Sequence, residues 1–286
     1  MGCDITNENI NKKDYKKLHS FFWLFSLDLK SSNKITQSII LNWIENNQNY
    51  NPKNWEIDTL SKRIISWLSN SKLSYENSDQ IYKEQFNKNI KKQINHLINE
   101  ISRSSLVDDK MIGCSAIILT GLSFKDEKNL NYGLNLLKKI INSSFDSEGF
   151  PKSRNIRQLI FYLKYFILIR EWLKESQTEI PEYLNEIIFY LGQAFNFTWQ
   201  NINQSLLFNG NHITDNSDFD KYLKFHNYKF KSEANEYGGY AILKNKSVIL
   251  SADIGPSPDK KFSNDYQLGS LSFEIYYKEN KLISNS

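Results

Sequence analysis

Apolar residues recur every three or four positions from Tyr15 to about Phe195, which is the spacing of amphipathic helices. Eight such segments alternate with short connections rich in Asn, Ser, Lys and Asp. The first four apolar stripes are Leu18, Phe21, Phe22, Phe25 and Leu29; Ile35, Ile39, Trp43 and Ile44; Ile57, Leu60, Ile64, Ile65 and Leu68; and Ile90, Ile94, Leu97, Ile98 and Ile101. Because each helix buries its apolar face only against others, we expect hairpins that close into a ring or bundle.

Two of the helical segments differ from this pattern. Residues 111–122 are rich in small side chains, including Gly113 and Gly121, which allow close contact with another helix or with a ligand. Residues 156–173 are apolar on nearly every side, which predicts an inner helix packed by neighbours all round. The tryptophans at 23, 43, 55 and 67 either line a sugar cleft or fill the core, and their aliphatic neighbours favour the core.

Beyond Trp199 the apolar period falls toward two, which indicates β-strands. One hairpin is predicted from residues 240–243 to residues 248–250, and a second from residues 271–277 to residues 282–283. The predicted sheet is therefore antiparallel. A β-domain that stops directly after a return strand leaves an unpaired edge, so we expect the chain to be a fragment.

The composition is that of a globular protein: 286 residues, of which 40% are hydrophobic and 24% are charged. The net charge is +4, and the lysines are scattered, so we expect no nucleic-acid partner. No apolar run is long enough for a transmembrane segment, and residues 1–17 lack the apolar core of a secretory signal. Cys3 and Cys114 lie too far apart in unrelated contexts to indicate a disulfide or a metal site.

A polar loop at residues 148–155 separates two strongly apolar helical runs and is the first candidate site. Gly149 and Pro151 end the preceding helix, and Ser153 can cap the next one. Arg154 and Asn155 then lie where backbone N–H groups and the helix dipole attract an anion. The alternative is a capped helix connection in which Arg154 pairs with an acid such as Glu148 and Asn155 caps the helix.

Several short motifs occur in a recognisable order. They are Phe22-Trp23-Leu24-Phe25 with Trp43-Ile44, Glu148-Gly149 with Ser153-Arg154-Asn155, Leu206-Leu207-Phe208-Asn209-Gly210, and Ala252-Asp253-Ile254-Gly255-Pro256 followed by Gly269-Ser270-Leu271-Ser272-Phe273-Glu274. In these motifs the chain resembles the heparinase II/III family of polysaccharide lyases. The resemblance implies an α+β multidomain protein: a polar segment at 1–14, an incomplete α/α toroid at 15–200, a junction at 201–219 and the beginning of an antiparallel β-sandwich at 220–286.

The resemblance also implies cleavage of an acidic, uronate-containing polysaccharide by β-elimination, which needs a base, an acid and a group that neutralises the carboxylate. The family's Asn-His pair falls on Asp109-Lys110, its loop histidine on Pro151, its tyrosine on Gln158 and its second histidine on Gln267, so none of the four is retained. The remaining candidates for catalysis are His212, Tyr162 and Tyr237. The candidates for substrate binding are Ser153, Arg154, Asn155, Lys110, Gln158 and Gln267.

Three hypotheses remain open at this point. The chain is a polysaccharide lyase, a catalytically degenerate protein that binds glycans or envelope polysaccharide on the same fold, or an intracellular helical interaction module. The resemblance implies an acidic polysaccharide or oligosaccharide as partner and no cofactor, although the family's β-domain sometimes holds a structural metal. It places the protein in a bacterial periplasm or cell envelope, with the cytoplasm as the alternative because no signal peptide is recognised. The oligomeric state stays open.

Overall fold

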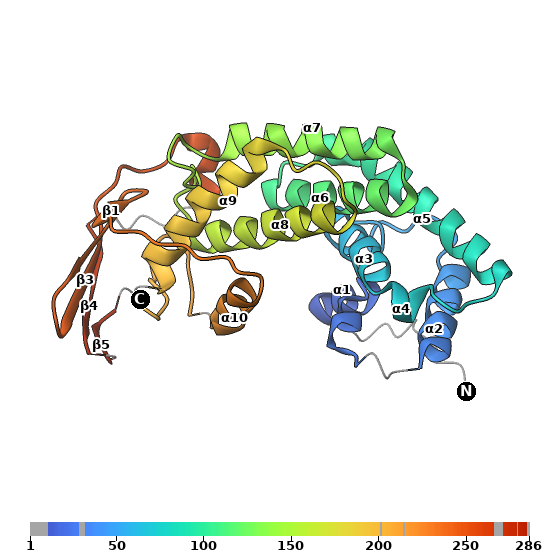
Figure 1. Cartoon of the computed structure of the whole chain (residues 1–286), viewed down its shortest axis with the longest axis horizontal. Coiled ribbons are helices and arrows are strands. Elements are labelled where there is room, and N and C mark those ends of the chain that lie inside the picture. Colours follow the sequence, from blue (N-terminus) through green and yellow to red (C-terminus); the bar gives the residue numbers. More distant parts are fainter. Residues whose placement is uncertain are drawn as a thin grey trace. The chain divides into compact units, whose positions relative to one another are not determined.

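The computed structural model describes residues 11–28, 32–200, 202–213, 215–265, 271–278 and 280–284. Helices come first and an antiparallel sheet follows, so the predicted α+β class is confirmed (Figure 1). The chain divides into two compact units, Met1–Leu137 and Lys138–Ser286. This division falls inside the predicted toroid at 15–200, so the boundaries predicted at 200 and 220 stay a prediction. No helix in the described ranges combines the length and hydropathy needed to cross a membrane.

The first unit is helical. Its elements are α1 (Lys12–His19), the 3-10 helix η1 (Phe22–Ser26), α2 (Asn33–Asn46), α3 (Ile57–Ser69), α4 (Ser71–Ser74), α5 (Gln80–Glu100), the 3-10 helix η2 (Ile101–Arg103) and α6 (Val107–Phe124), and α7 (Glu127–Ser144) begins in it. The single helix predicted across the first apolar stripe is wrong. Phe21 has a left-handed backbone (φ 55°) that interrupts the helical ladder, so α1 and η1 are separate. Leu29 of that stripe lies outside the described residues.

The buried face of α2 also differs from the predicted stripe. Ile35 and Ile39 are 64% and 36% exposed, whereas Ile40, Trp43 and Ile44 are buried. Gln37 shares the buried face because its side-chain amide donates to the backbone carbonyl of Glu76, at 3.0 Å. A satisfied amide can replace an aliphatic side chain there, and an apolar pattern alone does not reveal it.

The small residues of α6 allow close contact with α7. A Cβ added to Gly121 would lie 2.6 Å from the backbone nitrogen of Leu130, so only glycine fits there. The thiol of Cys114 donates to the carbonyl of Gly133 across the same contact, at 3.2 Å. Close helix packing, one of the two roles predicted for these residues, is therefore confirmed, and close ligand approach stays a prediction.

A buried arginine organises the start of the first unit. The Arg63 guanidinium, with 0% exposure, donates to the His19 carbonyl at 2.9 Å, to the Asn54 carbonyl at 3.1 Å and to Gln93 Oε1 at 2.8 Å. It also lies 4.2 Å from the centre of the Trp43 ring. Trp43 donates its indole N–H to His19 Nδ1, at 2.9 Å, so His19 is held as an acceptor. Trp43, Trp55 and Trp67 are all buried, which confirms the core interpretation for them.

The second unit contains the rest of α7, α8 (Ile156–Glu175), α9 (Glu182–Phe195), the π-helix η3 (Asn196–Gln200), α10 (Ser217–Phe225) and the 3-10 helix η4 (Lys260–Asp265). Twelve of the 20 residues of α8 are buried, as expected for an inner helix. It packs against α9, and Arg170 Nε donates to Asn185 Oδ1 between them, at 2.9 Å. The sequence reading missed α10, whose first three residues lie in the predicted junction at 201–219 and whose last six lie in the predicted β-sandwich.

Five strands form one antiparallel sheet in sequence order (Figure 1). They are β1 (Glu236–Tyr237), β2 (Tyr240–Lys244), β3 (Val248–Asp253), β4 (Phe273–Tyr277) and β5 (Asn280–Ile283). Both predicted hairpins are present, and β3 also pairs with β4, with Leu250 opposite Ile275. One face buries Tyr240, Ile249 and Tyr276, whereas the other exposes apolar side chains. These are Leu243, Val248, Phe273, Tyr277 and Ile283, an outer face typical of a sheet that packs against another layer.

Lowering the pH from 7 to 5 is expected to destabilise the first unit by about 2 kcal/mol through His19 alone. Burial and then the positive charge of Arg63 lower the pKa of His19 from 6.5 to about 4. The unfolded chain is therefore protonated first, and stability that is present above pH 6.5 is lost as the pH falls toward 4. Urea unfolding followed by tryptophan fluorescence at the two pH values measures the loss.

His19→Gln should remove this part of the pH dependence, because glutamine does not titrate. His212→Gln is the matched control, since His212 is exposed and should leave the pH dependence intact. An identical pH dependence in His19→Gln and the unmodified protein would disprove the role of His19.

Candidate functional site

The loop before α8 is a compact turn built on Asp146. Its Oδ1 accepts hydrogen bonds from the backbone N–H groups of Glu148 at 3.0 Å and Phe150 at 2.8 Å. Gly149 has a positive φ of 73°, and Phe145 and Pro151 form an isolated bridge that closes the turn. Helix α7 has already ended at Ser144, so the prediction that the glycine and proline end it is wrong, and they shape the turn that follows the helix.

Asn155, not Ser153, is the N-cap of α8. Its Oδ1 accepts from the backbone N–H groups of Arg157 at 2.9 Å and Gln158 at 3.3 Å. Ser153 donates its hydroxyl to Gln158 Oε1, at 2.6 Å, and accepts from the Asn155 N–H, at 3.2 Å. The side chains of Ser153, Asn155 and Gln158 are all buried. They satisfy the helix start, as in a capped connection, and their predicted role in substrate binding stays a prediction.

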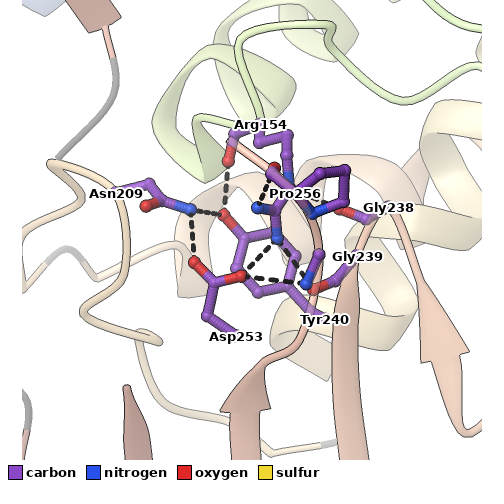
Figure 2. Close-up of polar contacts among 8 residues, drawn as sticks. Arg154, Asn209, Gly238, Gly239, Tyr240, Asp253 and Pro256 are labelled. Carbon is purple, nitrogen blue, oxygen red and sulfur yellow. Dashed lines mark hydrogen bonds and ion pairs between the residues drawn. The ribbon is translucent and has the colours of Figure 1, made fainter. Parts of the chain in front are cut away.

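Arg154 turns away from the helix start toward the sheet (Figure 2). Its backbone is left-handed, with φ of 58°, and its guanidinium forms an ion pair with Asp253. Nη1 donates to the Pro256 carbonyl at 2.7 Å, Nη2 to the Gly239 carbonyl at 2.7 Å and Nε to the Gly238 carbonyl at 3.2 Å. The acid that pairs with Arg154 is therefore Asp253 and not Glu148.

Two more side chains complete this network (Figure 2). Asn209 Nδ2 donates to Asp253 Oδ2 at 3.1 Å and to the Tyr240 hydroxyl, which in turn donates to the Arg154 carbonyl. The Arg154 guanidinium also lies 4.9 Å from the centre of the Tyr240 ring. We call Arg154, Asn209, Tyr240 and Asp253 the arginine latch. It joins the start of α8, the segment after η3 and the ends of β2 and β3.

Gly239 is the backbone position that this arrangement requires. Its φ is +79°, and an added Cβ would lie 2.6 Å from Arg154 Nη2. A side chain there would be strained and would also push the guanidinium away from its carbonyl partners.

A second buried acid anchors the next strand. Glu274 is fully buried and pairs with Lys281 at 3.0 Å, and it accepts from the Tyr276 hydroxyl at 2.6 Å and the Leu207 N–H at 3.3 Å. Lys281 also donates to the Ser205 carbonyl, at 3.0 Å. Burial, and then the hydrogen bond to Glu274, raise the pKa of Tyr276. Glu274 thereby fastens residues 205–207 to β4 and β5.

The three candidates for catalysis lie in different settings. His212 is exposed on a loop, whereas Tyr162 is 1% exposed on α8, with its ring 4.9 Å from that of Phe145. Tyr237 lies in β1 and donates to the Glu148 carbonyl at 2.7 Å. Burial, and then the nearby Glu148 charge, raise the pKa of Tyr237 to about 12. The phenol is therefore protonated at neutral pH and can donate a proton.

The remaining candidates lie apart from the latch in the chain. Lys110 is half-buried in the first turn of α6, in the first unit, and Gln267 lies outside the described residues. In the described ranges, no group of three or more His, Cys, Asp or Glu side chains is placed to hold a metal ion.

Sequence reasoning missed the roles of Asn209, Tyr240 and Asp253. One signal was present, because Asp253 ends an apolar strand and Glu274 lies between apolar residues of another. An acid at a buried strand position requires a cationic or hydrogen-bonding partner. The partner itself could not be found from spacing, since Arg154 and Asp253 are 99 positions apart.

Removing the arginine of the latch should destabilise the second unit strongly. Arg154→Met leaves the Asp253 carboxylate buried without its counter-charge, which is expected to cost about 3–5 kcal/mol. The double variant Arg154→Met/Asp253→Leu should be less destabilised than the sum of the two single changes, because it removes both charges together. Urea unfolding followed by circular dichroism measures all three.

Arg157→Met is the matched control, since Arg157 is exposed three positions further along α8 and should change stability by less than about 0.5 kcal/mol. Equal losses in Arg154→Met and Arg157→Met, or strictly additive single changes, would show that the latch is not a coupled unit.

The comparisons with known proteins agree with this architecture. Residues 229–286 match the family model described as heparinase II/III-like, C-terminal. No curated protein sequence matches the chain.

Solved structures share the fold at low sequence identity. Heparinase III has a TM-score of 0.76 and 17% identity, covering 100% of this chain and 52% of its own. The heparinase III-BT4657 gene product has a TM-score of 0.72 and 12% identity, and the match covers 99% of this chain and 53% of that protein. Heparan sulfate lyase HepC from Pedobacter heparinus has a TM-score of 0.66 and 13% identity, and the match covers 94% of this chain and 47% of that protein. The chain thus spans about half the length of these proteins. The resemblance to the heparinase II/III family is therefore confirmed, in the fold of the whole chain and in the sequence of residues 229–286.

Proposed function

We propose that the protein acts on acidic, uronate-containing polysaccharide and cleaves it by β-elimination. The observation that carries this proposal is the agreement of fold along the whole chain with heparinase III and with a heparan sulfate lyase. The C-terminal family match supports it independently, because it rests on sequence. By the same resemblance we propose a bacterial periplasm or cell envelope as the location.

The proposed reaction sets clear chemical demands. A base removes the proton alpha to the uronate carboxylate, the electron pair forms a carbon–carbon double bond, and the glycosidic carbon–oxygen bond breaks. The departing oxygen takes up a proton. Since the carbon acid is weak, a cationic or hydrogen-bonding group must stabilise the charge that develops on the carboxylate.

Two accessible residues fit these demands by their chemistry. His212 carries an exposed imidazole, the side chain that most often serves as a general base. Tyr237 carries a phenol that is protonated at neutral pH, because burial raises its pKa, and it therefore has a proton for the departing oxygen. Lys110, in the first unit, stays a predicted substrate-binding residue. Tyr162 is the weakest candidate, because its 1% exposure leaves little access for a polymer.

A second candidate function is glycan binding without turnover. The loss of acid–base chemistry favours it: Gln158, at the position of the family's tyrosine, is no general base at neutral pH and accepts a hydrogen bond from Ser153. The latch arginine is accessible to neither function, because Arg154 is bonded to Asp253 and three carbonyls. A glycan carboxylate would have to displace Asp253 to reach the Arg154 guanidinium. Pro151, at the position of the family's loop histidine, offers no titratable group.

Turnover is tested by incubating the protein with heparan sulfate, chondroitin sulfate and other uronate polysaccharides and following the ultraviolet absorbance of the unsaturated product. If the assignments hold, His212→Ala and Tyr237→Phe should each lower kcat by about 100-fold or more, which is the usual contribution of a general base or acid. Their folding is checked by circular dichroism.

The controls are His96→Gln and Tyr277→Phe, a histidine of the first unit and an exposed tyrosine of the outer sheet face. Both should retain full turnover. Absence of product with every acidic glycan, together with measurable binding, would support the degenerate protein. Absence of both product and binding would overturn the proposed function.

A further inference from the structure

A cleft of about 560 Å³ lies on the first unit, between α5, the end of α6 and the first turn of α7. Its apolar base includes Ile90 and Ile94, which are buried on α5. Every residue that lines it belongs to the first unit, so the cleft is formed by that unit alone.

The rim of this cleft is basic. Lys88, Lys91 and Lys128 line it, all three are exposed, and none forms an ion pair with another described residue. One acid, Asp126, also lines it, but its carboxylate caps α7 by accepting from the N–H of Asn129 at 3.1 Å and from its side-chain amide at 2.9 Å. The start of α7 stabilises that carboxylate. The cleft is therefore lined by three lysines that form no ion pair with the described residues and by one carboxylate that already has hydrogen-bond partners.

The basic cleft continues into an aromatic one. A neighbouring cleft of about 330 Å³ shares Asn87 and Phe124 with it and is also lined by Trp67, Tyr75 and Phe86. Phe124 is 42% exposed, and Asn87 donates to the Tyr75 hydroxyl, at 3.1 Å. Cations, side-chain amides and an accessible aromatic ring therefore follow one another along a single groove.

We propose that this groove, lined by Lys88, Lys91, Lys128, Asn95 and Phe124, is an accessory binding site for an acidic oligosaccharide. The lysines would meet carboxylate or sulfate groups, the amides would bond hydroxyls, and the Phe124 ring would cover the apolar face of a sugar. The class of ligand rests on the proposed function. Single-stranded nucleic acid fits less well, because it favours a series of aromatic platforms for successive bases. Trp67 and Phe86 are buried, so the groove offers the exposed Phe124 and the half-buried Tyr75.

The groove is distinct from the positions that the reaction would use. Lys110 lies near the start of α6, whereas Thr120 and Phe124 line the groove at its end. At a rise of 1.5 Å per residue, these two residues lie about 15 and 21 Å from Lys110 along the helix axis. Among the residues that line the basic part, the capped Asp126 is the one carboxylate, and there is no histidine or tyrosine. The site therefore holds polymer and does no proton transfer.

The test titrates the full chain with a heparin octasaccharide by isothermal calorimetry, with ultraviolet absorbance read at the end to detect cleavage. The triple variant Lys88→Ala/Lys91→Ala/Lys128→Ala should weaken binding about tenfold, since each exposed charge contact contributes modestly. Replacing the same three residues by arginine should retain binding, and Phe124→Ala should weaken it about threefold. Binding should also weaken as salt is raised.

The matched control is Lys13→Ala/Lys34→Ala/Lys53→Ala, which removes the same charge from exposed positions of the first unit outside the groove. Equal weakening in both triple variants would show a non-specific charge effect and overturn the proposal, as would no weakening in the groove variant. Tighter groove-dependent binding of a single-stranded oligonucleotide would overturn the ligand class. Loss of turnover in His212→Ala with groove-dependent binding unchanged separates this site from the proposed reaction.

Discussion

The carboxylate of Asp253 is completely buried at the end of β3, and the Arg154 guanidinium is the cation that makes its burial tolerable. A guanidinium presents its donors in one fixed plane, so the pair also fixes directions. Through that plane Arg154 binds the carbonyls of Gly238, Gly239 and Pro256. The entry angle of α8 and the ends of β2 and β3 are therefore set by one side chain, and a shift in any of them would leave a buried charge unpaired.

The same physical device recurs where segments distant in sequence meet. Glu274 binds Lys281 and the Leu207 N–H, which ties the segment after η3 to the sheet. In α8, the buried Glu171 accepts from the Tyr228 hydroxyl at 2.6 Å and from Arg170 at 3.2 Å, so the chain after α10 is held against that helix. Apolar packing tolerates small shifts of one segment relative to its neighbour, whereas a buried charge with directional hydrogen-bond partners does not. These acids accordingly specify how the segments of the second unit are arranged.

The regular parts of this fold follow from the sequence, because periodicity reports which side of an element faces the core. Both hairpins and the inner helix α8 were predictable for that reason. The break at Phe21 was not, since a left-handed phenylalanine has no local sequence signal. Nor was the buried Gln37, whose partner is a backbone carbonyl. In the site, the capping of α8 was foreseeable from Ser153 and Asn155 as a class, but the partner of Arg154 depends on contacts between residues about a hundred positions apart.

These contacts bear on where the proposed acidic ligand would find its counter-charge. A cation that recognises a polymer must be accessible. Arg154, the arginine that the sequence singles out, is buried, and its N–H groups donate to Asp253 and three carbonyls. Most of the cations that remain accessible are lysines, which act as flexible point charges and contribute modestly one by one. Several weak contacts spread along a groove suit a repeating polymer, because each repeat offers the same acidic group. The fold thus separates its strong, buried ion pairs, which determine structure, from its weak, exposed cations, which are suited to binding.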